Sequence, residues 1–314
     1  MIVERSGIND MATRNYRVLH QTHYRYTSPV ALSHQLLHLT PRALPWQSCT
    51  LHRIEVDPQP AEFREREDYF GNPVGHFVVA APHDALIVRA QSEVRVSLRG
   101  VQRPFSDSPA WEAVRERLRQ IGTAPLLGPA QYLFESPHAG ASADLAAYAG
   151  PSFAGGRSLL AAALDLNRRI HQDFEFDAGA TDVTTLLHEV LSRRRGVCQD
   201  FAHLMIGCLR SVGLAARYVS GYILTTPPPG RPRLVGADAS HAWVSVFCPE
   251  LGWVDFDPTN DRLVDAEYIT LGWGRDFGDV TPMRGVILGG GGQELEVEVT
   301  VTPMDAAASS TTRG

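Results

Sequence analysis

The apolar residues of this sequence change their period part-way along the chain. Between Tyr16 and Tyr26, aromatic and aliphatic side chains alternate with mostly polar or basic neighbours, which is typical of a half-buried strand. After Ser158 the apolar residues recur every three or four positions, as they do along the buried face of a helix. The sequence therefore predicts an α+β protein, in which an antiparallel β-sandwich or partly closed barrel precedes a mixed domain.

The length and the turn residues indicate the domain organisation. A chain of 314 residues corresponds to about two domains. Strand-like segments separated by the turns DPQP, GNP and APHD extend to about Leu98. The next segment is rich in Pro, Ser, Ala and Gly, with one expected helix that starts near Ser108 and includes WEAVRERLRQ. We therefore predict a disordered leader (1–15), a β domain (16–100), a linker with one helix (101–157), a second domain (158–303) and a disordered tail (304–314).

Composition excludes several classes of function. The formal net charge of −6 argues against general binding of nucleic acid. No apolar run approaches the ~18 residues of a membrane span. The N-terminus lacks the apolar core of a signal peptide, so we expect a cytoplasmic protein that does not act at a membrane. The four cysteines are too few for a disulfide framework and lack metal-ligand spacing, so we expect free thiols, no metal and no cofactor.

One cysteine lies at an expected helix start. In RRRGVCQDFAHLMIGCLRSVG the apolar residues have helical spacing, which predicts a buried helix from about Cys198 to Val212 that ends at Gly213. Unpaired N–H groups and the helix dipole stabilise a thiolate at this position, and the thiolate is the nucleophile. The same N–H groups are candidate donors to an oxyanion. Taken alone, a cysteine at a helix start is more often an inert core residue than a nucleophile.

The segment SHAWVSVFCPELGWVDFDPTN supplies an imidazole and a carboxylate. His241 opens one expected strand and Asp257 closes the next. An imidazole can take the thiol proton, and a carboxylate can orient the imidazole. A hairpin loop with an odd number of residues, or a β-bulge, would place Asp257 opposite Trp243 and on the face of His241. We predict such a loop, with Phe247, Trp253 and Asp255 on that face in the regular register and Val244, Val246, Val254 and Phe256 on the other.

These motifs resemble a known family. RRGVCQDFAH, SGY, SHAWV and GWVDFDPTN are similar to motifs of the bacterial transglutaminase-like superfamily, whose core is papain-like and follows a β domain in one subfamily. The resemblance implies that Cys198 is the nucleophile, His241 the base and Asp257 the orienting carboxylate. It also implies a second oxyanion donor upstream, for which Gln172, Phe174 and Phe176 are candidates. A zinc site formed by Cys198, His203 and Cys248 is a weaker alternative, because no ligand pair has the usual spacing.

Several functions remain open at this stage. We expect acyl transfer from an amide of a protein or peptide substrate through a Cys198 thioester, and we favour hydrolysis by a cysteine protease or amidase. An amine acceptor would instead make the chain a transglutaminase (a protein-glutamine gamma-glutamyltransferase). Acetyl transfer from a thioester cofactor uses the same triad on a related core. The remaining alternative is a non-catalytic binding scaffold, and the sequence does not specify the oligomeric state.

Overall fold

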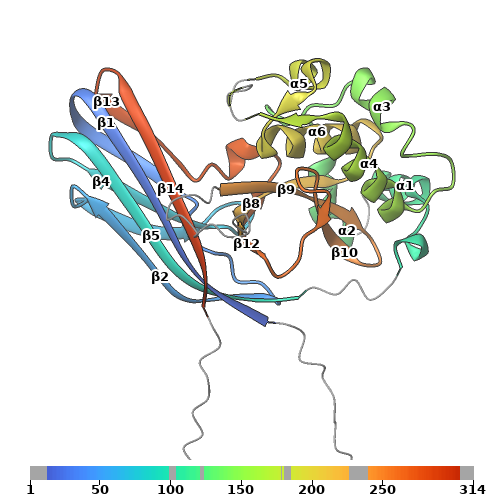
Figure 1. The fold of residues 1–314 in the computed structure, drawn as a ribbon, viewed down its shortest axis with the longest axis horizontal. Helices are drawn as coiled ribbons and strands as arrows, with labels where there is room; N and C mark the ends of the chain where they lie inside the picture. Colours follow the sequence, from blue (N-terminus) through green and yellow to red (C-terminus); the bar gives the residue numbers. More distant parts are fainter. Residues whose placement is uncertain are drawn as a thin grey trace, which may run out of the picture.

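The computed structural model describes residues 13–98, 104–120, 124–177, 179, 185–225 and 240–304. Residues 1–12 of the expected leader and 305–314 of the expected tail lie outside this range, as does the proline-rich loop within 226–239. The described residues form a β domain beside a domain of helices and strands, so the α+β prediction is confirmed (Figure 1). None of the described helices combines the length and apolar composition that a membrane span requires.

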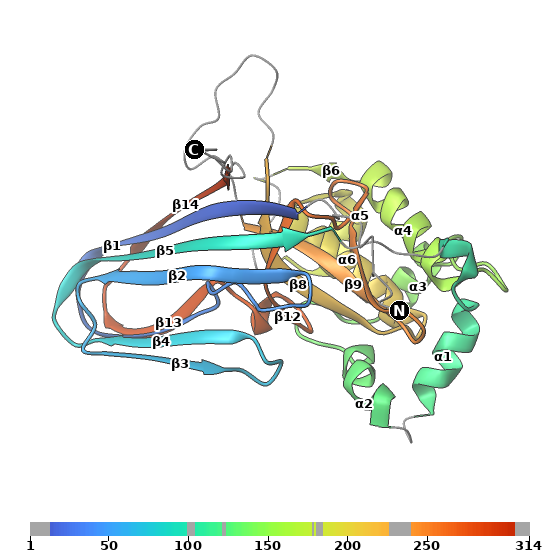
Figure 2. The ribbon, with the colours of Figure 1, turned by 90° about the horizontal axis from the view of Figure 1, so that it is seen from below.

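A curled antiparallel sheet of seven strands forms the β domain (Figure 2). Its path is β2-β5-β1-β4-β3, and β13 and β14 also pair with β1. The alternation seen in the sequence is present in β1, where Tyr16, Val18 and His20 are buried and the residues between them are more exposed. The strands are β1 (Thr13–Leu37), β2 (Gln47–Asp57), β3 (Glu62–Glu67), β4 (Pro73–Val79), β5 (His83–Ser97), β13 (Met283–Gly289) and β14 (Gln293–Met304).

The last two strands correct the predicted domain boundaries. We assigned residues up to 303 to the second domain, but β13 and β14 belong to the N-terminal sheet. In β14, Val301 lies opposite Val18 and Val299 opposite His20, so both valines bury their side chains on the inner face of the sheet. Residues 13–15, which we placed in the leader, are part of β1. Alternation identifies a strand, but it does not tell which sheet the strand joins.

The predicted linker is also more ordered than we expected. Besides the expected helix, observed as α1 (Trp111–Arg119), it holds α2 (Ala124–Ala130), α3 (Ala143–Ala149) and the short turns η1 (Phe105–Asp107) and η2 (Gln131–Leu133). Val114, Leu118 and Leu145 of this segment lie in the main apolar cluster of the second domain. The Ser142 hydroxyl caps α3 by accepting a hydrogen bond from the Leu145 N–H at 3.2 Å. These residues therefore form part of the second domain.

A central helix and a five-stranded antiparallel sheet form the rest of this domain. Every residue of α6 from Asp200 to Arg210 is buried, as the helical spacing predicted, and the helix packs on β8 and β9. The sheet order is β11-β10-β9-β8-β12. The helices are α4 (Leu159–Asp173), α5 (Leu187–Arg193), α6 (Cys198–Ser211) and the turn η3 (Phe277–Asp279); the strands are β8 (Ala216–Ile223), β9 (Ser240–Cys248), β10 (Gly252–Asp257), β11 (Arg262–Leu263), β12 (Tyr268–Gly274) and the short parallel pair β6 (Glu175–Phe176) and β7 (Arg195–Gly196).

The β domain covers the edge of this second sheet. β12 is the edge strand, and two side-chain amides of the β domain bind its backbone in place of a further strand. The Gln47 side chain donates to the Thr270 carbonyl and accepts from the Thr270 N–H, both at 2.7 Å. The Asn72 side chain does the same for Trp273, at 2.8 and 3.0 Å. An edge covered in this way cannot pair with another chain.

Candidate active site

The local sequence around Gly196 places Cys198 at the first position of α6. The chain enters the helix through β7 and Val197, and the Val197 N–H donates to the buried Asp200 carboxylate at 2.8 Å. A Cβ at position 196 would lie only 2.8 Å from an oxygen of Asp200, so glycine is needed there. The first helical bond runs from the Phe201 N–H to the Val197 carbonyl. The N–H groups between Val197 and Phe201 therefore precede the helical ladder, as the sequence predicted.

His241 connects Cys198 to Asp257. The imidazole lies near the start of β9 and is 7% exposed. Its Nε2 donates to Oδ2 of Asp257 at 2.7 Å, which leaves Nδ1 for the thiol of Cys198, a further side-chain hydrogen-bond partner. Burial opposes the charged imidazolium, but these two partners outweigh that effect and raise the pKa of His241 to about 10. The structure thus brings all three predicted residues together.

Asp257 is fully buried and held by several donors. Besides His241, the Asn260 side chain and the Tyr268 hydroxyl donate to Oδ2, each at 2.7 Å. The Thr259 N–H donates to Oδ1 at 2.9 Å. Burial would raise the pKa of Asp257, but the hydrogen bonds and the charge of His241 outweigh it and hold this pKa below its usual value. The carboxylate therefore stays ionised and fixed in orientation at neutral pH.

The hairpin register confirms the predicted odd loop. Cys248 pairs with Gly252, so three residues form the loop, and Phe256 pairs with Val244. The next step along this register sets Asp257 opposite Trp243, one diagonal step from His241. The indole Nε1 of Trp243 lies 3.4 Å from Oδ2 of Asp255, which agrees with the predicted shared face.

Three residues near the triad were not identified from the sequence. Asn260 follows Asp257 by three positions, and its place in DPTN was the only available signal. Tyr268 reaches Asp257 from β12, a contact that depends on the order of strands in the sheet. Tyr218 of β8 is 3% exposed and packs against His203 of α6, with ring centres 5.0 Å apart. Burial, with the charges of Cys198, Asp200 and Asp276, raises the pKa of Tyr218, which therefore remains protonated.

The three residues that the sequence suggested as the second oxyanion donor do not lie in positions that support this role. Phe174 is buried against Tyr148 and Phe201, and Phe176 is 56% exposed. Neither phenylalanine side chain can donate a hydrogen bond. Gln172 is exposed on α4. Tyr218 is a buried side-chain donor whose pKa responds to the charge of Cys198.

The residues of the zinc alternative do not converge. Nε2 of His203 accepts a hydrogen bond from the Phe277 N–H at 3.1 Å. Cys248 lies at the end of β9 opposite to His241, next to Glu250. Among the described residues, no group of three or more His, Cys, Asp or Glu side chains is placed to hold a metal ion.

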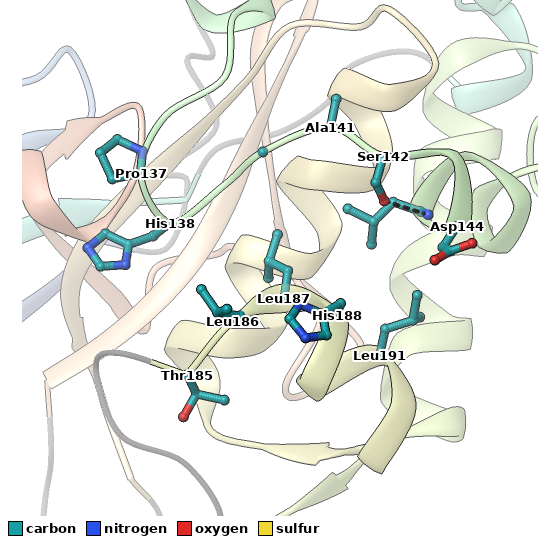
Figure 3. A pocket seen from close by; sticks show the side chains of 12 residues that line it. Pro137, His138, Ala141, Ser142, Asp144, Thr185, Leu186, Leu187, His188 and Leu191 are labelled. Carbon is teal, nitrogen blue, oxygen red and sulfur yellow. Dashed lines mark hydrogen bonds between the residues drawn. The ribbon is translucent and has the colours of Figure 1, made fainter.

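A pocket of about 430 Å³ has none of the triad residues in its lining. Figure 3 shows the side chains that line it. Its walls come from the segment before α3 and from α5, including His138, Ser142 and Leu187. It borders α6 near Gly207, because a Cβ there would lie within 3.0 Å of Leu145 and Leu187. Nine residues at about 100° each turn Gly207 to the side of the helix opposite Cys198. The pocket is therefore separate from the candidate active site.

Comparisons with known proteins agree with this architecture. The family model of the bacterial transglutaminase-like N-terminal region matches residues 16–95, and that of the transglutaminase-like superfamily matches residues 146–258. An uncharacterized protein of Mycobacterium tuberculosis is 42% identical over 306 residues, which cover 94% of this chain and 95% of that protein. The chain belongs to the transglutaminase-like superfamily. The resemblance that the motifs indicated is thus confirmed, and with it a family of thiol-dependent enzymes.

Two further relatives of this transglutaminase-like protein have descriptions that name an activity. A protein-glutamine gamma-glutamyltransferase of Pseudomonas aeruginosa is 38% identical over 106 residues, which cover 32% of this chain and 15% of that protein. A crystal structure described as a candidate cysteine protease of Cytophaga hutchinsonii has a TM-score of 0.71 and 19% identity, and the match covers 94% of this chain and 92% of that one. At this identity the second likeness shows the shared fold.

Proposed function

We propose that this chain is an enzyme that transfers the acyl group of a protein or peptide amide to water, as a cysteine protease or amidase does. The observation that carries the proposal is the buried series of hydrogen bonds from Asp257 through His241 to Cys198. A nucleophile, a base and a group that orients the base are the parts that amide cleavage needs. The position of the thiol at a helix start adds donors for the anionic intermediate.

Acylation follows from the roles of these three residues. His241 holds the proton of the Cys198 thiol on Nδ1, and the sulfur attacks the carbonyl carbon of the amide. The carbon–nitrogen bond then breaks, the amine leaves with the proton from His241, and a thioester with Cys198 remains. Asp257 keeps Nε2 protonated throughout and stabilises the imidazolium.

Hydrolysis of the thioester restores the enzyme. Water gives a proton to His241 and attacks the thioester carbon, the acid product leaves, and Cys198 is again a thiolate beside the protonated His241. The oxyanion of each tetrahedral intermediate has two candidate donors, the N–H groups at the start of α6 and the protonated Tyr218 hydroxyl. We propose Tyr218 for the side-chain role, because its buried phenol lies near Cys198 and stays neutral.

Transfer to an amine is the second candidate function. The similarity to the gamma-glutamyltransferase of Pseudomonas aeruginosa is the observation that favours it. Both reactions share the thioester and differ only in the molecule that resolves it. The chain has no lysine, so its own side chains offer no amine for cross-linking.

Selective alkylation tests whether Cys198 is an activated nucleophile. Burial raises the pKa of Cys49 and Cys248, and raises that of Cys208 to about 12, so these three thiols serve as internal controls. We expect iodoacetamide to label Cys198 alone near pH 6 to 7, as located by mass spectrometry, and His241→Ala to abolish this preference. Equal labelling of all four cysteines, or labelling only above pH ~8.5, would favour a non-catalytic scaffold.

A peptide assay then distinguishes the two reactions. The protein is incubated with a glutamine-containing peptide and a labelled primary amine, and with Cys198→Ala as the control. We expect hydrolysis to exceed incorporation of the amine, and incorporation that outpaces hydrolysis would establish the transglutaminase instead. With Tyr218→Phe we expect slower hydrolysis by about 10²-fold but unchanged alkylation of Cys198, because alkylation forms no oxyanion.

A further inference from the structure

Tyr268 links the triad to a strand outside the catalytic hairpin. Its hydroxyl donates to Oδ2 of Asp257 at 2.7 Å, and its side chain is fully buried. The ring packs edge-on against Trp243, with centres 5.4 Å apart, and lies 6.1 Å from the His241 ring. Tyr268 therefore touches both partners of the histidine–carboxylate pair.

The donors to Asp257 come from different parts of the sheet, so they hold its carboxylate relative to different elements. Asn260 and Thr259 lie in the turn that follows Asp257, so they hold the carboxylate relative to its own turn. Tyr268 belongs to β12, which lies at the opposite edge of the sheet from β10 and β11. Its hydrogen bond thus ties the end of β10 to the far side of the sheet. Because His241 is hydrogen-bonded to this carboxylate, the contact with Tyr268 also sets the position of the imidazole.

The β domain holds the segment that leads into β12. The buried Tyr16 hydroxyl of β1 donates to the Ala266 carbonyl at 2.9 Å, two residues before Tyr268. Arg14 pairs with Glu267 at 2.7 Å, although this pair is partly exposed and contributes less. Ala266 also packs with Tyr16 and Val18 in one apolar cluster. A continuous series of contacts therefore runs from β1 to Asp257.

We propose that Tyr268 is a positioning residue for the His241–Asp257 pair, and that the β domain fixes Tyr268 through Tyr16. This inference rests on the proposed function, because it concerns the same triad. It gives the β domain a role in the chemistry of the second domain without any contact with substrate. The hydroxyl of Tyr268 acts through Asp257 and takes no part in bond making.

The test uses the full chain and three tyrosine-to-phenylalanine variants. Tyr268→Phe removes the hydrogen bond to Asp257, Tyr16→Phe removes the bond to Ala266, and Tyr26→Phe is the matched control. Tyr26 lies on β1 within the apolar cluster of the β domain, away from the second domain. The rate of Cys198 alkylation by iodoacetamide is measured from pH 4 to pH 10, together with the melting temperature of each variant.

We expect Tyr268→Phe to slow alkylation near pH 6 by about tenfold and to shift the acid limb of the profile to higher pH, since a displaced imidazole accepts the thiol proton less readily. Tyr16→Phe should shift the profile in the same direction by less, and Tyr26→Phe should match the wild type. A lower melting temperature with an unchanged profile would reduce Tyr268 to a structural role and overturn the proposal.

Other outcomes distinguish the role of Tyr268 from the role of the β domain. A shifted profile for Tyr268→Phe with a wild-type profile for Tyr16→Phe would refute the role of the β domain. If Tyr268→Phe does not fold, the Tyr16→Phe profile decides: a shift supports the proposal, and its absence overturns it. A wild-type protein whose Cys198 reacts no faster than the other thiols would instead refute the proposed function itself.

Discussion

At the scale of single residues, the site depends on how the charge of Asp257 is held. Tyr268, Asn260 and the backbone of the following turn surround a carboxylate that is fully buried. A buried charge with this many donors keeps both its ionisation and its orientation. His241 then receives a fixed partner, and its raised pKa follows from that partner and from Cys198.

The His241–Asp257 pair makes stability depend on pH. Folding raises the pKa of His241 from 6.5 to about 10, so the pair stabilises the fold fully below pH 6.5 and progressively less as the pH rises toward 10. Folding lowers the pKa of Asp257 from 3.8, so its contribution is lost only as the solution becomes more acidic than that value. We expect the wild type to exceed Asp257→Asn in free energy of unfolding most between about pH 4 and 6.5.

Urea unfolding of both proteins at several pH values measures this difference. It should shrink steadily toward about pH 10, where His241 loses its proton. Asp84→Asn, which removes one exposed negative charge of β5, is the control and should show only a small effect at every pH. A difference that grows between pH 6.5 and 10 would contradict the assignment of a charged pair.

At the scale of secondary-structure elements, close approach between strands shapes the site. Gly221 of β8 lies beneath Trp243 of β9, whose ring packs against Tyr268 of β12. A Cβ at Gly221 would lie 2.0 Å from the Ile269 carbonyl oxygen and 2.5 Å from the Trp243 ring. The backbone is the obstacle on one side, so a small rotation of a side chain cannot relieve the clash.

Gly221→Ala should therefore destabilise the second domain. We expect the free energy of unfolding, measured in urea, to fall by about 1–3 kcal/mol or more. The added methyl group would overpack the space between two strands. Gly128→Ala in α2 is the matched control, since a methyl group added there would have no neighbouring atom within 4 Å. Equal stability of the two variants would show that β12 can move away from β8 at little cost.

The elements also show what the sequence could and could not predict. The register of one hairpin predicted that Asp257 lies on the face of His241, and a helix start marked Cys198. The resemblance of the motifs to the transglutaminase-like superfamily is what joined the three residues in one site. The helix α3 was missed because its alanine-rich sequence lacks a clear apolar stripe, although Ser142 offered a capping signal. The contact of Tyr268 with Asp257 joins β12 to β10, and no local pattern encodes the order of strands within a sheet.

At the scale of the whole molecule, two amide side chains join the domains. Asn72 is fully buried, and its side chain binds the Trp273 backbone, Arg42 and Asp68. Arg42 in turn stacks over the Trp273 ring at 3.7 Å. The β domain and the second sheet therefore share a buried polar network in addition to the apolar cluster that joins Tyr16 and Val18 to Ala266.

Asn72→Ala should weaken this junction strongly. The substitution leaves the N–H and carbonyl of Trp273 without their partner, and each buried group that loses its hydrogen bond costs about 1–3 kcal/mol. We expect a lower melting temperature and faster cleavage by protease between the domains. Gln91→Ala, at an exposed position of β5, is the control and should be nearly neutral. A neutral Asn72→Ala would mean that the domains are held by apolar packing alone.

The pairing of β1 with β14 has a consequence for biosynthesis. Asn15 lies opposite Met304, so the opening and the closing stretches of the fold are hydrogen-bonded neighbours. When β1 leaves the ribosome, almost the whole chain has still to be translated before β14 is available to pair with it. The first domain in the sequence is consequently the last to be completed, and the nascent chain must keep one long strand edge shielded until translation is nearly finished.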